Sequence, residues 1–463
     1  MRIYILFFML LAISLYMFRY SRKRSISPSF IASFMFMGFS FIYIVSMDMM
    51  NRDITRRSFQ VILTFMAAMC LGEATANKII IRTRKKHCIC RKADRDEVTD
   101  ILFSKYRTYA IFLLMCFAAF IRYLSVYSYG ISLGLQADLF SVIGIVRNDG
   151  GYINDTGKII SSLVYVGEFA AYIYTFLFVY SIKKLRKIKY YLLLPVIGLL
   201  LMEIPSMNRN TLIQIGAAFL MSYFFCVERE KKNGLRVNVK GILCSVTVLL
   251  TAFFAYGNLI RPGKKDGLTA FRFLRVQITQ YSAASLYCLD DYILNPAKYA
   301  DYFKGKDFRQ YIDCFLGLKD SVVRMTDYPW RIDGYPSNIF TGMFSFLQDF
   351  GFWGTAAVGF VISFASVKIE NYLLELDICT YKFYIWMWVW HLLMYDIIML
   401  PITNSFPAKF LNPGYILRMI FAMAVSYILI SGLKFKYLES GVKKMRKRIK
   451  LKRICISQAA WRR

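Results

Sequence analysis

Residues 159–182 form the stretch IISSLVYVGEFAAYIYTFLFVYSI, in which Glu168 is the only side chain that is charged at neutral pH. A helix rises about 1.5 Å per residue, so this stretch is long enough to cross the roughly 30 Å of hydrocarbon in a bilayer. Similar apolar stretches lie at 3–18, 29–47, 58–77, 108–127, 190–204, 211–227, 239–257, 349–367, 383–400 and 414–433. The sequence therefore predicts an all-α, multi-pass membrane protein with about 11 transmembrane helices.

The composition agrees with a membrane protein and disfavours a soluble one. Hydrophobic residues make up 57% of the chain and charged residues 19%, with a mean hydropathy of +0.42, whereas soluble proteins carry roughly 25% charged residues. The net charge of +31 does not indicate nucleic-acid binding, because much of it lies in short clusters between the apolar stretches. The segment His87-Cys88-Ile89-Cys90 lacks a second Cys or His pair at structural-zinc spacing. We expect no metal site and no cofactor.

Basic clusters set the predicted orientation. They lie at 19–24, 78–107, 183–189, 229–240 and 434–463, which is every second connection between the predicted helices. Lys and Arg are enriched on the cytoplasmic side of membrane proteins, so we expect the N-terminus outside the cytoplasmic (inner) membrane and the C-terminus in the cytoplasm. The predicted organisation is eight helices in 1–257, a large outer loop in 258–337, three helices in 338–433 and a basic cytoplasmic tail in 434–463.

The outer loop is expected to fold against the membrane domain. Phe271, Leu274, Ile278 and Tyr281 recur at helical spacing and form an apolar stripe. Arg272, Arg275, Thr279 and Ser282 share a different face. This pattern predicts an amphipathic helix at the outer interface, either with its cations facing a polar cleft or resting on anionic headgroups.

Ionisable residues inside the predicted helices mark a candidate site, because each costs a few kcal/mol to insert into lipid and so normally faces a partner or a cavity. Under the predicted topology, nearly all of them lie in the outer half or near the midplane, with Glu73 as a cytoplasmic exception. This asymmetry favours an enzyme that acts at the outer leaflet over a transporter. Arg122 and Arg418 could instead extend to the interface. Glu168 and His391 are too deep for that, so each is expected to have a partner inside the protein, and this partner could have a purely structural role. Besides Glu73, the strong cases are Arg122, Glu168, Glu203, Asp349, His391, Asp396 and Arg418.

Two neighbouring segments carry a family resemblance, DGYPSNIFT at 333–341 and QDFGFWG at 348–354. They resemble the Asn-x-x-Thr and Asp-Phe-Gly-x-x-Gly motifs of the Wzy proteins, the oligosaccharide repeat-unit polymerases of O-antigen, capsule and exopolysaccharide assembly. Ser206 to Arg209 resembles that family's Arg-bearing turn, and the large outer loop is also similar. One departure from the family pattern concerns a second outer loop, in which several relatives carry additional Arg residues. The corresponding loop of this chain, 128–158, contains only Arg147. The matching motif residues are Asn338, Thr341, Asp349, Phe350, Gly351 and Gly354.

The motif residues also have physical interpretations of their own. Asn338 could cap the helix that follows it by accepting from free backbone N–H groups. Gly351, Gly354 and Gly359 would allow close helix packing in lipid. We expect packing to be the main reason for these glycines.

The resemblance implies a GT-C-like membrane glycosyltransferase. It would transfer a growing glycan from one polyprenyl diphosphate carrier to the terminal sugar of another carrier-linked repeat unit, without a metal. The expected substrate is thus a polyprenyl-diphosphate-linked oligosaccharide in the lipid bilayer, with a flippase and a chain-length regulator as possible partners. Arg binds phosphate oxygens bidentately, so Arg209, Arg261, Arg272 and Arg275 are the diphosphate candidates. A base must deprotonate the acceptor hydroxyl, and Asp349 is the first candidate, with Glu168 and His391 second.

Three other functions fit parts of the sequence. An O-antigen ligase would share the architecture but pass the glycan to a lipid A core. A transporter or flippase for lipid-linked oligosaccharide would need a polar route to the cytoplasmic face. A membrane acyltransferase would need a deep His with an acidic partner, and the spacing of His391 and Asp396 is off the i, i+4 helical face.

Overall fold

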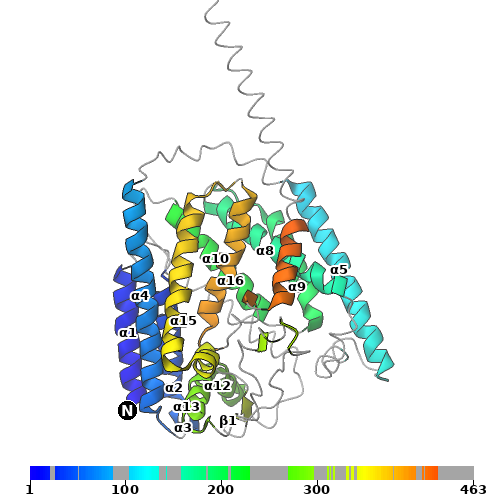
Figure 1. Cartoon of the computed structure of the whole chain (residues 1–463). Helices are drawn as coiled ribbons and strands as arrows, with labels where there is room; N and C mark the ends of the chain where they lie inside the picture. Colours follow the sequence, from blue (N-terminus) through cyan, green and yellow to red (C-terminus); the bar gives the residue numbers. More distant parts are fainter. Residues whose placement is uncertain are drawn as a thin grey trace, which may run out of the picture.

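The computed structural model is a bundle of helices (Figure 1). It describes residues 1–20, 27–50, 52–86, 104–134, 142, 158–183, 186–206, 210–229, 270–296, 310–311, 313, 316–318, 330–332, 335–337, 341–378, 380–402, 409–410 and 412–425. The predicted span 239–257, the predicted tail 434–463 and the motif residue Asn338 lie outside this set.

Seven of the described helices are long and apolar enough to cross a membrane, which confirms the prediction of a helical membrane protein. All seven coincide with predicted spans. They are α1 (Arg2–Tyr20), α2 (Pro28–Val45), α4 (Arg56–Lys86, apolar to Ile80), α5 (Lys105–Ser132), α8 (Lys158–Lys183, apolar from Leu163), α10 (Asn210–Arg229) and α15 (Gly342–Glu375).

Three predicted spans are helices that fall short of this standard. The predicted span 190–204 is a 3-10 turn followed by α9 (Leu194–Glu203) and a second 3-10 turn (Ile204–Ser206); the apolar helix Tyr190–Glu203 is about 21 Å long at 1.5 Å per residue. The helix Pro413–Val425 is also short within the described part of the chain. Helix α16 (Tyr381–Met399) is long but rich in Trp, Tyr and polar residues.

Burial explains the composition of α16. Most of its side chains, including Trp388, Trp390 and His391, are buried. It packs against α2, α8, α10 and α15 and is therefore surrounded by protein. Helices α1 and α5, by contrast, expose large apolar side chains on the surface. A helix surrounded by other helices can carry polar groups that lipid would disfavour.

Helices α4 and α15 pack closely along their lengths, and glycines make this possible. A Cβ atom at Gly72 would lie 2.3 Å from the carbonyl oxygen of Phe360, and one at Gly359 would lie 2.9 Å from the Phe65 ring. The packing interpretation of Gly359 is therefore confirmed. Close backbone approach of this kind is typical of helix pairs in membranes.

Gly351 has a different role from the one predicted. It interrupts α15 with φ 66° and ψ −168°, so α15 is two helices joined at a kink. A Cβ atom at Gly351 would meet nothing within 4 Å, so the backbone conformation, and not packing, requires glycine there. A Cβ at Gly354 would lie 2.2 Å from the Cβ of Phe350 across the kink. The Asp-Phe-Gly-x-x-Gly motif thus encodes a bend.

The first residue of α15 is Gly342, directly after the motif residue Thr341. Thr341 is the N-cap, and its side chain makes no capping hydrogen bond; Asn338, the predicted cap, lies outside the described residues. The Gly342 amide instead donates to the carbonyl of Leu400 at 2.7 Å. Helix α15 is therefore fixed at its first residue to the end of α16.

The kink gives a direct mutational prediction. Gly351→Ala should destabilise the protein by about 1–2 kcal/mol, because an L-residue with a side chain is strained at positive φ. Gly38→Ala is the control, since Gly38 lies in α2 with nothing within 4 Å of its Cβ position and Ala favours a helix by up to about 1 kcal/mol. Unfolding of the two variants in the same detergent measures the difference. Equal stability of both would contradict the conformational role of Gly351.

One end of the bundle carries the outer-loop elements (Figure 1). These are α12 (Ala270–Tyr281), α13 (Ala283–Leu294) and an antiparallel hairpin of β1 (Trp330–Ile332) and β2 (Tyr335–Ser337). The N-terminus and the short helix α3 (Met47–Met50) lie at the same end. The predicted topology requires this arrangement, because successive connections alternate between the two sides of the membrane. It assigns the 48–57 connection and the 258–337 loop to the same side.

The buried face of α12 is not the predicted apolar stripe. Leu274 is 42% exposed, whereas Val276 and Thr279 are buried. The Thr279 hydroxyl lies 2.8 Å from the Ser46 hydroxyl at the end of α2. Helix α12 thus docks on the end of α2 and α3 partly through polar contacts, which an apolar periodicity does not report. That its apolar stripe rests on the membrane interface stays a prediction.

Candidate functional site

Buried and half-buried polar side chains from five helices gather around α8. On α8 itself, Tyr165, Glu168 and Tyr172 recur at i, i+3 and i+7 and so share one face. Contacts and electrostatic interactions join this face to α5, α9, α16 and the helix Pro413–Val425. We call this group the Glu168 cluster; its members are Tyr165, Glu168, Tyr172, Arg122, Glu203, His391, Tyr395, Asp396, Lys409, Tyr415 and Arg418.

Glu168 is the central acid of the cluster. It interacts electrostatically with Lys409, Glu203 and Asp396 and is surrounded by protein, yet its side chain remains partly accessible. Within the described part of the chain, no hydrogen bond or ion pair holds the Glu168 carboxylate. A deep carboxylate with accessible surface and no fixed partner is suited to contact a substrate.

Lys409 and Asp396 form a buried ion pair beside Glu168. The Lys409 ammonium donates to Asp396 Oδ1 at 2.6 Å, with both side chains less than 10% exposed, and it lies 4.3 Å from the centre of the Tyr395 ring. Sequence reasoning missed Lys409, because it falls between two predicted spans. Its apolar neighbours Phe406, Phe410 and Leu411 were the available signal that this connection stays close to the membrane core.

The two arginines of the cluster are held by protein partners. Arg122 of α5 donates to the Met202 carbonyl at 2.7 Å and to Glu203 Oε1 at 3.2 Å. It thus compensates the C-terminal end of the short helix α9, where backbone carbonyls lack helical partners. Arg418 donates to the Tyr165 hydroxyl at 3.2 Å. These contacts favour pairing over extension to the interface.

His391 lies behind Glu168, deeper in the bundle. Its Nε2 lies 3.1 Å from the Ser222 hydroxyl of α10, and its ring stacks on Tyr172 with the ring centres 5.6 Å apart. His391 and Ser222 are both fully buried. Of the three base candidates, Glu168 and His391 both lie next to Tyr172. Glu168 and Asp349 are partly accessible, whereas His391 is buried.

Asp349 belongs to another part of the molecule. It precedes the Gly351 kink and interacts with Tyr292 of α13, whose pKa is raised by burial and, to a smaller extent, by the Asp349 carboxylate. The Tyr292 ring packs against Phe344 of α15, with ring centres 4.5 Å apart. The described contacts therefore place Asp349 on the α13 side of α15, and Glu168 and His391 in the α8–α16 group.

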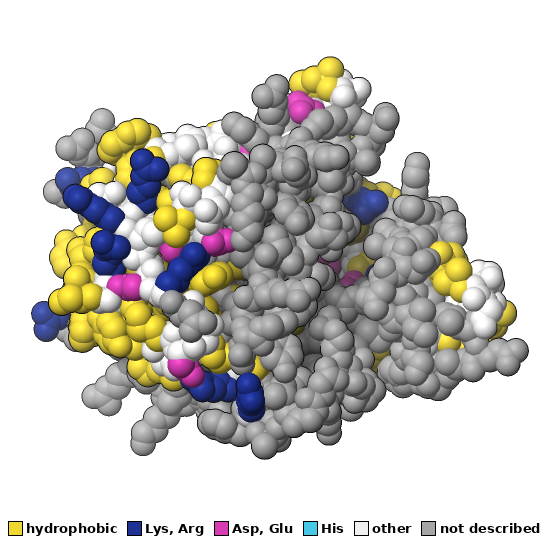
Figure 2. Space-filling model, turned by 90° about the horizontal axis from the view of Figure 1, so that it is seen from below, with side chains coloured by type: hydrophobic (Ala, Val, Ile, Leu, Met, Phe, Trp, Pro, Cys, Tyr) yellow, Lys and Arg dark blue, Asp and Glu magenta, His cyan; other side chains and the backbone are white. Residues whose placement is uncertain are grey.

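The four diphosphate candidates divide into two pairs. Arg209 and Arg261 lie outside the described residues. Arg272 is exposed on α12. Arg275 donates to Asp48 Oδ1 at 2.6 Å and to the Val45 carbonyl at 3.3 Å, and its hydrogen bond holds the pKa of Asp48 below the usual value. Figure 2 views the end of the bundle that carries α12 and shows basic and acidic side chains there among hydrophobic ones.

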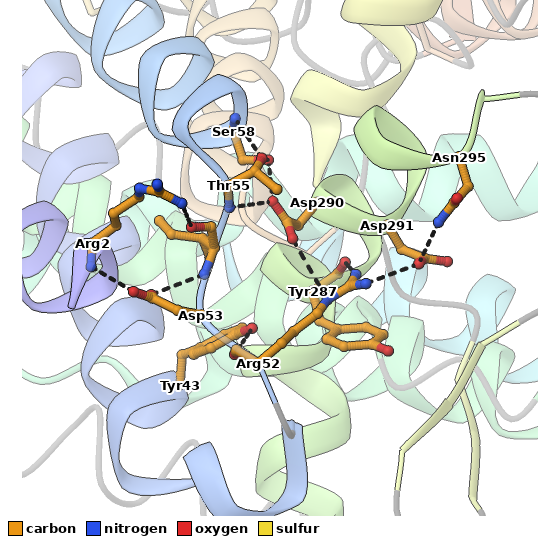
Figure 3. A network of polar contacts seen from close by, with 11 residues as sticks. Arg2, Tyr43, Arg52, Asp53, Thr55, Ser58, Tyr287, Asp290, Asp291 and Asn295 are labelled. Carbon is orange, nitrogen blue, oxygen red and sulfur yellow. Dashed lines mark hydrogen bonds and ion pairs between the residues drawn. The ribbon is translucent and has the colours of Figure 1, made fainter.

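A second polar network ties the outer loop to the membrane helices (Figure 3). The guanidinium of Arg52 lies 3.1 Å from Asp291 and 3.6 Å from Asp290 of α13, and 4.2 Å from the centre of the Tyr287 ring. Asp290, fully buried, accepts from the Thr55 amide at 2.7 Å and from the Ser58 hydroxyl. Asp290 thereby holds the start of α4, where the Ser58 amide donates to Thr55 Oγ1 at 3.3 Å, and the loop helix α13 is anchored to the α2–α4 connection.

A third polar group lies towards the other end of α4 and α15. Glu73 accepts from the Ser27 hydroxyl at 2.8 Å and from the Ser29 amide at 3.2 Å, so it caps the start of α2. Glu370 of α15 and Asn77 of α4 are also buried. Sequence reasoning recognised only Glu73 here, so the polar asymmetry between the two membrane halves is weaker than the sequence suggested.

Comparison with known proteins gives no match. Neither the family models, nor the curated proteins, nor the solved structures contain a significant match to this chain.

Proposed function

We propose that this chain is a membrane glycosyltransferase that polymerises polyprenyl-diphosphate-linked oligosaccharide repeat units at the outer face of the cytoplasmic membrane. The proposal includes the GT-C-like arrangement of about 11 transmembrane helices expected from the sequence. The observation that supports it most is Glu168, a carboxylate deep among helices that is partly accessible and has no hydrogen-bonding partner among the described residues.

The proposed reaction is a direct displacement. An acceptor hydroxyl on the terminal sugar of one carrier-linked unit attacks the anomeric carbon of the glycan on another carrier. The new glycosidic C–O bond forms as the anomeric bond to the diphosphate breaks, and the anomeric centre inverts. The hydroxyl proton passes to Glu168, which must lie within hydrogen-bond reach of it. The lipid diphosphate leaves with the bonding electron pair.

The leaving group needs positive charge near it, because the diphosphate carries the negative charge that develops. Arg272 and Arg275 of α12, with Arg209 and Arg261, remain the residues proposed for this role. The ion pair of Arg275 with Asp48 is exposed on both sides, 39% and 59%, and such pairs are worth only about 0–1 kcal/mol. A diphosphate could therefore replace Asp48 as the partner of Arg275 at little cost.

Deletion of the gene tests the class of reaction. A strain without the protein should still attach single repeat units to the final acceptor of the glycan, but it should make no polymer of two or more units. An O-antigen ligase would instead leave full-length polymer attached to its carrier, and that result would overturn the proposal. The products are distinguished by electrophoresis of surface glycan alongside extracted carrier lipid.

A second candidate function is favoured by the polar group at Glu73, Asn77 and Glu370. Buried polar residues in both membrane halves suit a transporter of lipid-linked oligosaccharide better than polar residues in one half. The same deletion strain separates the two functions. Loss of a transporter would leave repeat units in the inner leaflet, inaccessible to an external glycosidase, whereas loss of the polymerase leaves them accessible.

A further inference from the structure

The helix Pro413–Val425 presents an aromatic and polar face to Glu168. Asn412 accepts from the amides of Gly414 and Tyr415 at 2.9 and 3.4 Å, and Pro413 occupies the first helical position, so the start of the helix is fixed. Leu417, 66% exposed, lies on the outward face. Tyr415 and Arg418 lie on the inward face and contact α8.

Tyr415 and Arg418 of this helix form a compact unit with Tyr165 and Glu168 of α8. The rings of Tyr165 and Tyr415 meet edge to face, with centres 5.2 Å apart and an interplanar angle of 87°. The Arg418 guanidinium lies 5.3 Å from the centre of the Tyr165 ring and donates to its hydroxyl. Tyr165 and Tyr415 both interact electrostatically with Glu168. All four side chains are partly accessible.

Charge balance in the Glu168 cluster argues against an anionic ligand at this point. The acids Glu168, Glu203 and Asp396 equal the cations Arg122, Lys409 and Arg418 in number. Lys409 and Arg122 are already paired with acids of the cluster. Among the described members of the cluster, no net positive charge is left for a diphosphate, whose recognition requires uncompensated cations.

The unit suits a neutral, hydroxyl-rich ring. A pyranose has an apolar C–H face that can pack on a tyrosine ring, and a rim of hydroxyls that can donate to a carboxylate and accept from a guanidinium. Aromatic walls with a few placed polar groups are typical of small-molecule sites. We infer that Tyr165, Tyr415 and Arg418 form, with Glu168, the subsite that binds the acceptor sugar. The donor's diphosphate, bonded to the anomeric carbon under attack, is bound next to this subsite by other residues.

This inference rests on the proposed function and identifies one of its subsites. Tyr165 and Tyr415 orient the sugar ring, and Arg418 holds a hydroxyl beside the one that reacts. The attacking hydroxyl then lies next to Glu168, as the proposed displacement requires. The residues proposed for the diphosphate, Arg272 and Arg275, belong to the separate helix α12.

Binding of two probes to the full-length protein in nanodiscs tests the assignment. One probe is the octyl glycoside of the repeat oligosaccharide released from the host's own carrier lipid, which has no diphosphate. The other is farnesyl diphosphate, which has no sugar. Tyr415→Ala and Arg418→Met should each weaken binding of the glycoside at least about tenfold, or about 1.4 kcal/mol, because Tyr and Arg are enriched among the side chains whose truncation costs the most binding energy. Both variants should bind farnesyl diphosphate as the wild type does.

Matched variants control for loss of structure. Leu417→Ala, on the outward face of the same helix, should leave both affinities unchanged. If Tyr415→Ala or Arg418→Met fails to fold, Tyr165→Phe replaces it, because this change removes only the hydroxyl that Arg418 contacts and should still weaken glycoside binding severalfold.

The assignment is overturned if the wild type does not bind the glycoside, or if the variants weaken farnesyl diphosphate binding and not glycoside binding. Unchanged glycoside binding in Tyr415→Ala would also overturn it. Failure of the proposed function gives a different result: the protein would bind the glycoside through these residues but never elongate a carrier-linked glycan.

Discussion

Glu168→Gln is expected to reduce polymer formation by about 10²- to 10⁴-fold, the range that general-base catalysis contributes. The amide keeps the size of the side chain but cannot accept the hydroxyl proton. The Glu168 carboxylate has no hydrogen bond to a described residue, so its replacement should leave the fold intact. Polymer formed by purified variants, at equal protein and equal thermal stability, measures the effect.

Asp349→Asn is the matched comparison, because it too replaces a carboxylate with the amide of the same size. Asp349 belongs to the sequence motif and was the first base candidate. Asp349 lies with Tyr292 on the α13 side of α15, so its change should reduce activity less than Glu168→Gln does. The base assignment moves to Asp349 if the ranking is reversed. If Asp349→Asn mainly lowers the unfolding temperature, Asp349 has a structural role.

Asp290→Ala should be the most destabilising single change at the end of the bundle that carries α12 and α13. It leaves the Thr55 amide and Ser58 hydroxyl without their acceptor and takes one of two acids from Arg52. Removing one partner of a buried ion pair typically costs about 3–5 kcal/mol. Denaturant unfolding of the purified protein measures the loss.

Asp48→Ala provides the control, because it breaks a separate ion pair between this end of the bundle and the outer loop, that of Asp48 with Arg275. The pair of Asp48 with Arg275 is exposed, so its loss should cost less than about 1 kcal/mol. Comparable losses from the two changes would contradict the anchoring role of the Arg52–Asp290 network. The exposed pair should also weaken in acid, since the pKa of Asp48 is lowered in the folded state and its stabilisation is lost as pH falls through that value.

Hydropathy was enough to predict most of the helices. The long apolar stretches that the structure describes, from α1 to α10 and in α15, form helices, because an apolar stretch of that length has only a helix with which to satisfy its backbone in lipid. Helix α16 shows the limit of this reasoning. It was predicted by length, but its composition depends on burial inside the bundle, which hydropathy does not report.

The candidate site was only partly predictable. Glu168 and His391 were identifiable because an ionisable residue in an apolar stretch stands out by itself. Lys409 and Glu370 were missed because each lies where charge is expected, at a connection or near a helix end, and only the tertiary packing buries it. The kink at Gly351 could not be separated from helix packing without a backbone angle. Sequence spacing indicates which residues share a helix face, and packing decides which faces meet.

Purified protein reconstituted in a bilayer with a synthetic polyprenyl-diphosphate repeat unit tests the proposed function most directly. The account predicts a ladder of products, each longer by one repeat unit, with release of the free lipid diphosphate, and loss of both products in Glu168→Gln. Folded protein that binds the substrate but releases no lipid diphosphate and makes no ladder would contradict it.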